Sequence, residues 1–253
     1  YNKRNLLETE QAVLDGKTFM LDPNYNDLGH ITSLTTPGQT IAYVPDAWGR
    51  PTQFGGYASG ISYHPNGLPS DYNLGNGLSY SQTLNARQWP QHQQTVDGSS
   101  AIQSLQYGYT PAGNLTAITD MVDGSDNVTL TYDDLHRIET ATGIWGTYTY
   151  AYDPLNNLRS RTHGGGTASL SYSYNAASNH LTAIGGSQSR SYAYNTRGEI
   201  TGDGSQVFTL NNLGQIQSIT GIATYGYDGN GRRIRTVKDG TTEYTLYDRS
   251  GQL

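Results

Sequence analysis

The stretch Tyr150–Leu158, with the sequence YAYDPLNNL, reads as a β-strand that runs into a turn. Tyr150 and Tyr152 are two residues apart, so they share one face of a strand. Asp153 opens the turn, because its side chain can accept hydrogen bonds from the backbone N–H groups that follow it. Asn156 closes the turn at a position that often needs a positive φ, which Gly and Asn tolerate best. The stretch defines the pattern Tyr-(Asp/Asn)-x-x-(Gly/Asn)-x-(Leu/Ile).

The same pattern recurs 13 times along the chain, with a period of about 20.5 residues. The residues that open the turns are Asn2, Asn26, Asp46, His64, Asn85, Thr110, Asp133, Asp153, Asn175, Asn195, Asn211, Asp228 and Asp248. The residues that close them, three positions later, are Asn5, Gly29, Gly49, Gly67, Gln88, Gly113, His136, Asn156, Ser178, Gly198, Gly214, Gly231 and Gly251. We interpret these positions as structural, because a fixed period of this size indicates a repeat architecture.

The segments between these turns predict β-hairpins. In residues 128–132, for example, Val, Leu and Tyr alternate with Thr, which is typical of a half-buried strand. A second set of turns lies between the first, at Asp97-Gly98, Asp123-Gly124, Asp203-Gly204 and Asp239-Gly240. Asp-Gly is a favoured hairpin dipeptide. Each repeat therefore predicts one hairpin, and the chain as a whole predicts a continuous antiparallel meander.

The composition excludes several classes of protein. Hydrophobic residues make up 34% of the 253 residues and charged residues 14%, which argues against both a thick core and a disordered chain. Tyr outnumbers Phe by 21 to 3, and a Tyr ring can be buried while its hydroxyl reaches a polar partner. The net charge is −6, so nucleic acid is not an expected partner, because phosphate binding needs clustered Lys and Arg. No apolar run is long enough to span a membrane.

We expect one repeat array over residues 1–253, less regular over 1–105 and regular over 106–253. Tyr1 and Leu253 both fall inside a repeat, so we expect the chain to be a piece of a longer polypeptide. The longer loops of the first part are the expected place for function on a repeat scaffold.

The motif Tyr-Asp-x-x-Gly-x-Leu at this spacing resembles the YD-repeat, or RHS-repeat, proteins. The segments Tyr152–Leu158 and Tyr227–Arg233 lie close to the family consensus. Trp48–Thr52 and Leu74–Leu78 resemble further segments of bacterial members. The resemblance covers essentially the whole chain.

This family includes bacterial polymorphic toxins, the B and C components of Tc toxins, and the teneurin adhesion receptors. The resemblance implies an all-β fold in which a YD-repeat β-hairpin meander forms a long, curved, spiralling antiparallel sheet, part of a hollow shell. In the toxins of the family, a C-terminal toxic domain is held inside the shell and released by self-cleavage near an Asp-Pro-x-Gly-Leu motif. That motif does not occur here, because Asp153-Pro154-Leu155 is not followed by Gly-Leu.

The expected function is therefore that of a structural shell segment that encapsulates a cargo such as a toxin domain. The expected partners are the flanking repeats of the same shell and the enclosed toxin. The expected location is secreted or at the cell surface, or delivered by a bacterial secretion system. A polar wall of low charge suits this role, because it encloses aggregation-prone protein without offering it an apolar surface.

No catalytic, metal or cofactor site is predicted, and we do not expect an enzyme. The six His residues are scattered, and neither a zinc-protease helix motif nor a Gly-x-Ser-x-Gly elbow is present. The oxygens of Asp123, Ser125, Asp126 and Asn127 would suit Ca²⁺, but a hairpin turn needs the same residue types. We favour the turn.

A carbohydrate- or receptor-binding adhesion module is the alternative function. Trp48, Trp89 and Trp145 could stack on sugar rings, although aromatic residues on a sheet more often pack across strands. A β-propeller is the alternative fold, because two hairpins make a four-stranded blade. A propeller needs odd and even repeats to differ in a regular way, and the repeats show no such alternation.

Overall fold

The chain folds into β-strands joined by short turns. The computed structural model describes residues 1–166 and 168–247. The one helical segment of the described residues is a 3₁₀ turn, η1 (Gly124–Asp126), at the loop expected around Asp123. The Asp123 side chain accepts a hydrogen bond from the backbone N–H of Ser125 there. The chain divides into two units, residues 1–130 and 131–253.

The first unit contains eleven complete strands and most of a twelfth. These are β1 (Glu10–Leu14), β2 (Lys17–Tyr25), β3 (Ile31–Thr36), β4 (Gln39–Ala42), β5 (Gln53–Phe54), β6 (Ala58–Tyr63), β7 (Pro69–Leu74), β8 (Ser79–Leu84), β9 (Pro90–Asp97), β10 (Ser100–Tyr109), β11 (Leu115–Asp120) and β12 (Val128–Tyr132), in which the unit ends.

The second unit continues in the same way. Its strands are β13 (Ile138–Gly143), β14 (Gly146–Tyr152), β15 (Leu158–His163), β16 (Leu170–Tyr174), β17 (Leu181–Gly186), β18 (Arg190–Ser191), β19 (Ala193–Tyr194), β20 (Ile200–Gly202), β21 (Phe208–Leu210), β22 (Ile216–Ile219), β23 (Ala223–Tyr227), β24 (Arg233–Lys238) and β25 (Thr241–Tyr244).

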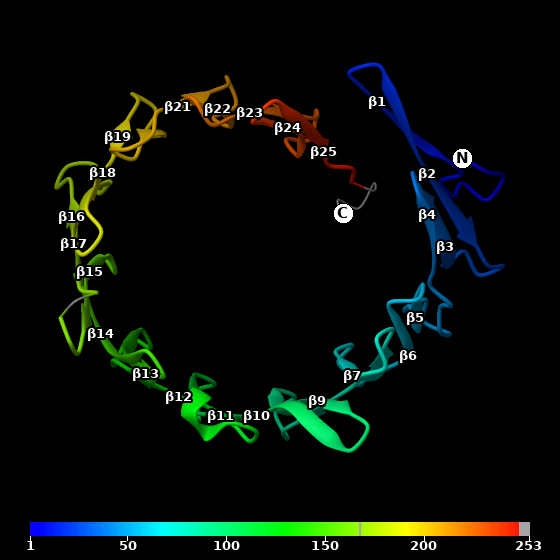
Figure 1. Ribbon diagram of the computed structural model, residues 1–253, viewed down its shortest axis with the longest axis horizontal. Helices are drawn as coiled ribbons and strands as arrows, with labels where there is room; N and C mark the ends of the chain where they lie inside the picture. Colours follow the sequence, from blue (N-terminus) through cyan, green and yellow to red (C-terminus); the bar gives the residue numbers. More distant parts are fainter. Residues whose placement is uncertain (167, 248–253) are drawn as a thin grey trace. The chain divides into compact units, whose positions relative to one another are not determined.

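Within each sheet, strands that follow one another in the chain lie side by side (Figure 1). Hydrogen bonding groups the strands into sheets of four (β1–β4), fourteen (β5–β18), two (β19 and β20) and five (β21–β25). Every described pair is antiparallel, and none of the four sheets closes on itself. The expected all-β antiparallel meander is confirmed.

Side chains alternate between the two faces of each strand. In β16, Leu170 is buried and Tyr172 and Tyr174 are half-buried, whereas Ser171 and Ser173 are exposed. The half-buried face is covered by neighbours on adjacent strands, as in the stacked rings of Tyr72 and Tyr80, whose centroids lie 4.5 Å apart. Cross-strand packing of this kind is the ordinary source of sheet stability.

The core is thin. Among the described residues, the buried apolar side chains are Pro23, Ile61, Ala141, Leu170 and Ala223. Elements in contact are neighbours in the chain, so in neither unit does a second sheet pack against the first. The low aliphatic content explains the single layer, because two sheets pack together only where each has an apolar face. Stability therefore depends on neighbour contacts within the sheet, as in other repeat proteins.

Candidate functional site

Successive connections of a meander lie alternately at the two long edges of the sheet. The connections that begin with the Asp/Asn openers therefore share one edge in each unit, which we call the turn edge. The connections between them, such as Gly98-Ser99 and Ile144-Trp145, share the opposite edge, which we call the hairpin edge. Within the described part of the chain, the predicted opener and closing residues belong to the turn edge, and the predicted Asp-Gly turns belong to the hairpin edge.

The turn at Asp153 illustrates the local geometry. The Asp153 N–H donates to the carbonyl of Asn157, and the Asn156 N–H donates to the carbonyl of Asp153, both at 3.0 Å. Asp153 Oδ1 accepts the backbone N–H groups of Leu155 and Asn157 at 2.9 Å each. Asn156 has φ 67°, in the left-handed region that Asn tolerates. Asp153 thus takes part in four hydrogen bonds with backbone groups of residues 155–157, two through its own backbone and two through its side chain.

The same geometry occurs at the other openers. The side-chain oxygen accepts the N–H groups two and four residues ahead at Asn2, Asn26, Asp46, Asn85, Asp133, Asn195, Asn211 and Asp228. Positive φ occurs at the closing residues Asn5, Gly29, Gly49, Gly67, Gln88, Gly113, His136, Asn156, Gly198, Gly214 and Gly231. Asp248 and Gly251 lie outside the described residues.

One closing residue was assigned wrongly from the sequence. The turn that opens at Asn175 is one residue longer than the others, and Asn179, not Ser178, has the positive φ, 57°. The Asn179 N–H donates to the Asn175 carbonyl at 2.8 Å. The three-residue spacing misled the assignment, because Asn tolerates the left-handed region and Ser does so less well. At His64 the opener side chain does not cap the turn, and Asn66 accepts the N–H of Leu68 instead.

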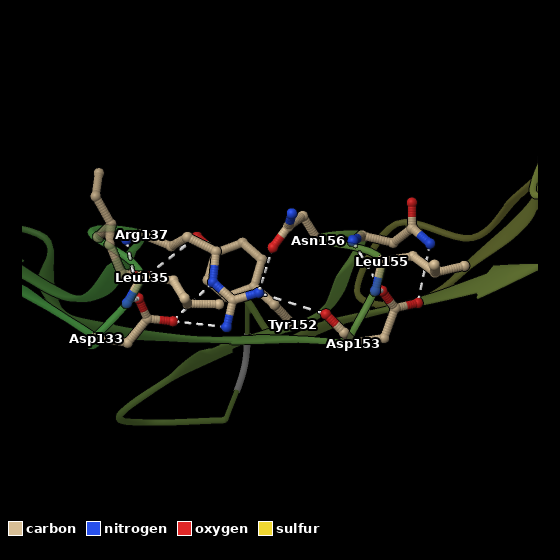
Figure 2. Close-up of polar contacts among 9 residues, drawn as sticks. Asp133, Leu135, Arg137, Tyr152, Asp153, Leu155 and Asn156 are labelled. Atoms are coloured by element: carbon tan, nitrogen blue, oxygen red, sulfur yellow. Dashed lines mark hydrogen bonds and ion pairs between the residues drawn. The ribbon is translucent and has the colours of Figure 1, made fainter.

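Side chains also link each turn to the next one along the edge. Figure 2 shows the side chain of Arg137 between two turns. Its Nε donates a hydrogen bond to Asp133 Oδ2 of its own turn at 2.7 Å, and its Nη1 donates one to Asn156 Oδ1 of the next turn at 2.8 Å. The guanidinium also lies over the Tyr152 ring, 4.6 Å from its centroid. One side chain therefore ties two repeats together.

Other turns use different residues for the same link. Asn157 Nδ2 donates to Asn179 Oδ1 at 2.7 Å, and Gln215 Nε2 donates to the Gly231 carbonyl at 2.9 Å. In the first unit, Arg4 donates to the Asp27 carbonyl at 2.7 Å. The described turns thus form a ladder of polar contacts along the turn edge of each unit.

The closing glycines have a second role in this ladder. In most described turns, the residue directly after the closing residue lies against the closing residue of the next turn. A Cβ added at Gly113 would lie 3.0 Å from the Trp89 ring, and one at Gly198 would lie 3.0 Å from the His180 ring. Glycine there supplies both the positive φ and the space for the preceding repeat.

The Tyr hydroxyls form a second set of links between repeats, which the sequence analysis missed. Tyr152 donates to the Ile138 carbonyl at 3.1 Å and Tyr174 to the Leu158 carbonyl at 3.0 Å. Tyr109, Tyr194 and Tyr227 make the same bond to the first residue of the preceding return strand, and Tyr63 makes it to Pro51, just before β5. The signal was the excess of Tyr over Phe, because only Tyr can make this bond.

Hydrogen bonds lower the pKa of the opener carboxylates Asp133 and Asp153. The Arg137 backbone N–H and then its guanidinium lower the pKa of Asp133, and the Asn157 side-chain amide lowers the pKa of Asp153. Burial raises the pKa of the Tyr152 hydroxyl. At pH 7 the carboxylates are charged acceptors and the phenol is a neutral donor, which suits structural bonds. None of these shifts creates an acid–base pair poised near neutral pH.

The three Trp residues occupy unlike places. Trp48 is 78% exposed in its turn, with the Arg50 guanidinium 4.8 Å from its ring centroid. Trp89 packs on Tyr109, with ring centroids 5.2 Å apart. Trp145 lies in a hairpin of the second unit, against Gly143. In the first unit, the turn at His64 separates Trp48 from Trp89, and sugar stacking on these rings stays a prediction.

Two further kinds of site are absent from the described part of the chain. No three His, Asp or Glu side chains there are grouped so that they could hold a metal ion. None of its segments is a helix with the length and apolar character to cross a membrane.

A single-layer meander with an Asp/Asn turn ladder along one edge defines the YD-repeat class of proteins. The sequence matches the teneurin YD-shell family over residues 72–249, and the chain belongs to that family. The resemblance inferred from the repeat motif is confirmed, and proteins of this shell type are structural. No curated protein sequence matches the chain significantly.

Structures of Tc toxin proteins are among the solved structures that share this fold. The Photorhabdus luminescens Tc holotoxin pore carrying a TccC3 mutation aligns with TM-score 0.75 and 16% identity over 91% of this chain and 14% of that chain. The crystal structures of TcdB2-TccC3, and of TcdB2-TccC3 without its hypervariable C-terminal region, align with TM-scores of 0.68 and 0.69. Both are 17% identical over 91% of this chain and 15% of theirs. The chain thus spans about one seventh of the length of these structures.

Proposed function

We propose that this chain is a wall segment of a hollow YD-repeat shell that encloses a polypeptide cargo such as a toxin domain. The shell protein is secreted, exposed at a cell surface, or delivered by a secretion system. Membership of the YD-shell family and the shared fold of the Tc toxin structures support this proposal. The observation that carries it is the single-layer sheet, whose stability comes from links between neighbouring repeats and not from a core.

The chemistry of the sheet suits a container wall. In β16 (Leu170–Tyr174), one face carries exposed Ser residues and the other carries Tyr rings that are half-buried. Neither face is a continuous apolar surface, so an enclosed chain that is partly unfolded would not be captured by it. The opener carboxylates are bonded within their own turns, and several pair with Arg, so they offer little free charge.

Site-specific photocross-linking tests the proposal. A photoreactive phenylalanine analogue is placed at Tyr172 or at Ser173, which point to opposite faces of β16, in the full-length protein that carries this chain. If the sheet is a wall, one position cross-links to a cargo segment of the protein and the other does not. The result expected from a wall is thus a strong asymmetry between two adjacent residues.

The alternative outcomes contradict the proposal. Equal cross-linking at Tyr172 and Ser173, or cross-linking to no other segment from either position, would mean that neither face lines a filled cavity. Cross-links from an exposed face to an external glycoprotein would favour an adhesion module instead.

A further inference from the structure

Arg161 places a charged side chain at a position of the repeat that is often apolar. It lies on the return strand β15 (Leu158–His163), opposite Tyr150 of β14. At the equivalent position, other return strands carry Leu34, Ile118, Ile184 and Ile219. Arg is rarely buried in proteins unless an acceptor pairs with it, so a half-buried Arg at this position needs an explanation.

The described residues supply no acceptor for Arg161. Its side chain is half-buried, with the guanidinium carbon 4.8 Å from the centroid of the Tyr148 ring. Its Nε is buried and makes no hydrogen bond, and the described residues form no ion pair with it. The two terminal nitrogens also lack partners within the described chain but stay accessible from the surface. Such a charge destabilises the fold, because no partner offsets its loss of hydration.

Arg137, of the same unit, shows the contacts of a structural Arg (Figure 2). Its guanidinium lies 4.6 Å from the centroid of the Tyr152 ring, much as that of Arg161 lies over Tyr148. Arg137 also donates hydrogen bonds to the side chains of two turns. Arg161 has the ring contact without the acceptors, so the cation–π contact orients its guanidinium and leaves the donors unused.

The strand register places hydroxyl donors beside Arg161. Tyr150 lies opposite it on one side and Leu170 on the other, and Tyr172 is the diagonal neighbour beyond Leu170. The hydroxyls of Tyr150 and Tyr172 make no hydrogen bond to the described residues. A guanidinium flanked by phenol hydroxyls suits an anion that has several acceptor sites.

A carboxylate fits this arrangement better than a phosphate does. One guanidinium balances one negative charge, and its terminal nitrogens match the two oxygens of a carboxylate. A phosphate dianion needs a second cation. The nearest candidate in the strand, Arg159, is exposed and lies over the Tyr174 ring, 5.8 Å from its centroid.

We infer that Arg161 is the centre of a carboxylate-binding site on the Tyr face of β14, β15 and β16, and that its ligand is an Asp or Glu side chain of the enclosed polypeptide. The terminal nitrogens of Arg161 donate to both carboxylate oxygens, and the hydroxyls of Tyr150 and Tyr172 are available for the remaining lone pairs. The source of the carboxylate rests on the proposed function, whereas the site itself does not.

Two Leu variants of the 253-residue chain separate a binding role from a structural one. Arg137→Leu removes a paired guanidinium and should lower the melting temperature. Arg161→Leu removes an unpaired charge and leaves an apolar side chain, as at Leu34 and Ile184 in other strands. It should raise the melting temperature by about 2–4 °C, because residues kept for binding are often unfavourable for stability.

Nuclear magnetic resonance of the Arg161 Nε–H group measures binding, and loss of the signal in Arg161→Leu assigns it. The probe is glutamate blocked by an acetyl and a methylamide group, so the side-chain carboxylate is its only charge. Blocked glutamine is the matched control. The glutamate probe should shift the signal in a saturable manner, with an affinity about tenfold or more above that of the glutamine probe, because charge-assisted hydrogen bonds are the stronger ones.

Three results would overturn the inference. These are an Arg161→Leu chain that unfolds or melts at a lower temperature than the wild type, equal shifts with the glutamate and glutamine probes, and tighter binding of inorganic phosphate than of the glutamate probe. The assay contains no cargo, so it is distinct from the cross-linking test. Binding without cross-links from Tyr172 would contradict the wall and keep the site, and cross-links without binding would do the reverse.

Discussion

The guanidinium of Arg137 lies 4.6 Å from the centre of the Tyr152 ring, which belongs to the following repeat (Figure 2). The same group binds Asp133 and Asn156, so Arg137 connects three residues of two repeats. Replacement by Gln should lower the melting temperature, since the cation–π contact alone contributes about 0.5–1 kcal/mol. Thermal unfolding followed by circular dichroism measures the effect.

Arg137→Lys is the matched variant for this link. Lys keeps the charge but lacks the planar fork that reaches two acceptors at once. It should therefore recover only part of the stability lost in Arg137→Gln. Full recovery by Lys would mean that charge, and not the bridging geometry, is what matters at this position.

The opener carboxylates should make stability depend on pH. The pKa of Asp133 and that of Asp153 are lowered in the folded chain by the hydrogen bonds that they accept. A lowered pKa stabilises the folded state fully above the unfolded value, near 3.9, and the contribution is lost as pH falls through the folded value. Denaturant midpoints measured from pH 6 downward should fall in the acid range.

Asp153→Asn is the variant that isolates this effect. Asn opens the turns at Asn26 and Asn195 with the same backbone bonds, so the turn should form without a titrating group. The variant should lose less stability between pH 5 and pH 2 than the wild type does. An unchanged acid dependence would show that the Asp153 hydrogen bonds do not couple protonation to folding.

The turn-closing glycines allow strain and contact to be separated. Gly113 (φ 96°) and Gly67 (φ 87°) both need the left-handed region, but an added Cβ meets the Trp89 ring at Gly113 and nothing within 4 Å at Gly67. Gly67→Ala should lower the free energy of unfolding by about 1 kcal/mol, because of backbone strain. Gly113→Ala should lower it by more, because Trp89 must move as well.

Equal losses at Gly67 and Gly113 would mean that the side chain of the preceding repeat yields freely. The same comparison extends to Gly198 and Gly231, where the nearest atoms belong to His180 and Gln215. Urea denaturation of the four Ala variants measures all of these effects on one scale.

The sequence predicted the opener and closer positions because their chemistry is local. A carboxylate or carboxamide caps the N–H groups that follow it, and Gly or Asn accepts a positive φ, so both can be read from spacing. Gln88 and His136 also adopt positive φ, 64° and 60°, although their residue types gave no such signal. Their spacing from the openers identified them.

The links between repeats could not be predicted in the same way. Their donors are chemically diverse, since Arg137, Asn157 and Gln215 perform the same task at the same position of the repeat. Their acceptors are often backbone carbonyls, which every residue possesses. Such contacts depend on how neighbouring strands are aligned, and the alignment shifts by one residue just before the turns, as at Ala151/Tyr152. A single sequence does not reveal that shift.

The Tyr hydroxyl ladder should contribute measurably to stability. Tyr174 donates to the Leu158 carbonyl, whereas the hydroxyl of Tyr172, on the same strand and face, makes no hydrogen bond to the described residues. Tyr174→Phe should therefore cost about 1 kcal/mol, and Tyr172→Phe should be close to neutral. Comparable effects at both positions, measured by urea denaturation, would remove the ladder as a source of stability.

The shape of the chain in solution is the last expectation. The sequence predicts a long antiparallel meander, and right-handed strand twist prevents a long sheet from lying flat. The sequence predicts a curved, spiralling wall, because the exposed face of Ser, Thr and Ala cannot form the interior of a sandwich.

Small-angle X-ray scattering tests this shape. A compact globule of 253 residues has a radius of gyration of about 18 Å. A curved single layer places its mass farther from its centre, so its radius of gyration should clearly exceed that value and its pair-distance distribution should be broad. A radius near 18 Å would instead mean that the hairpins gather into blades around a common axis, which is the arrangement of a propeller.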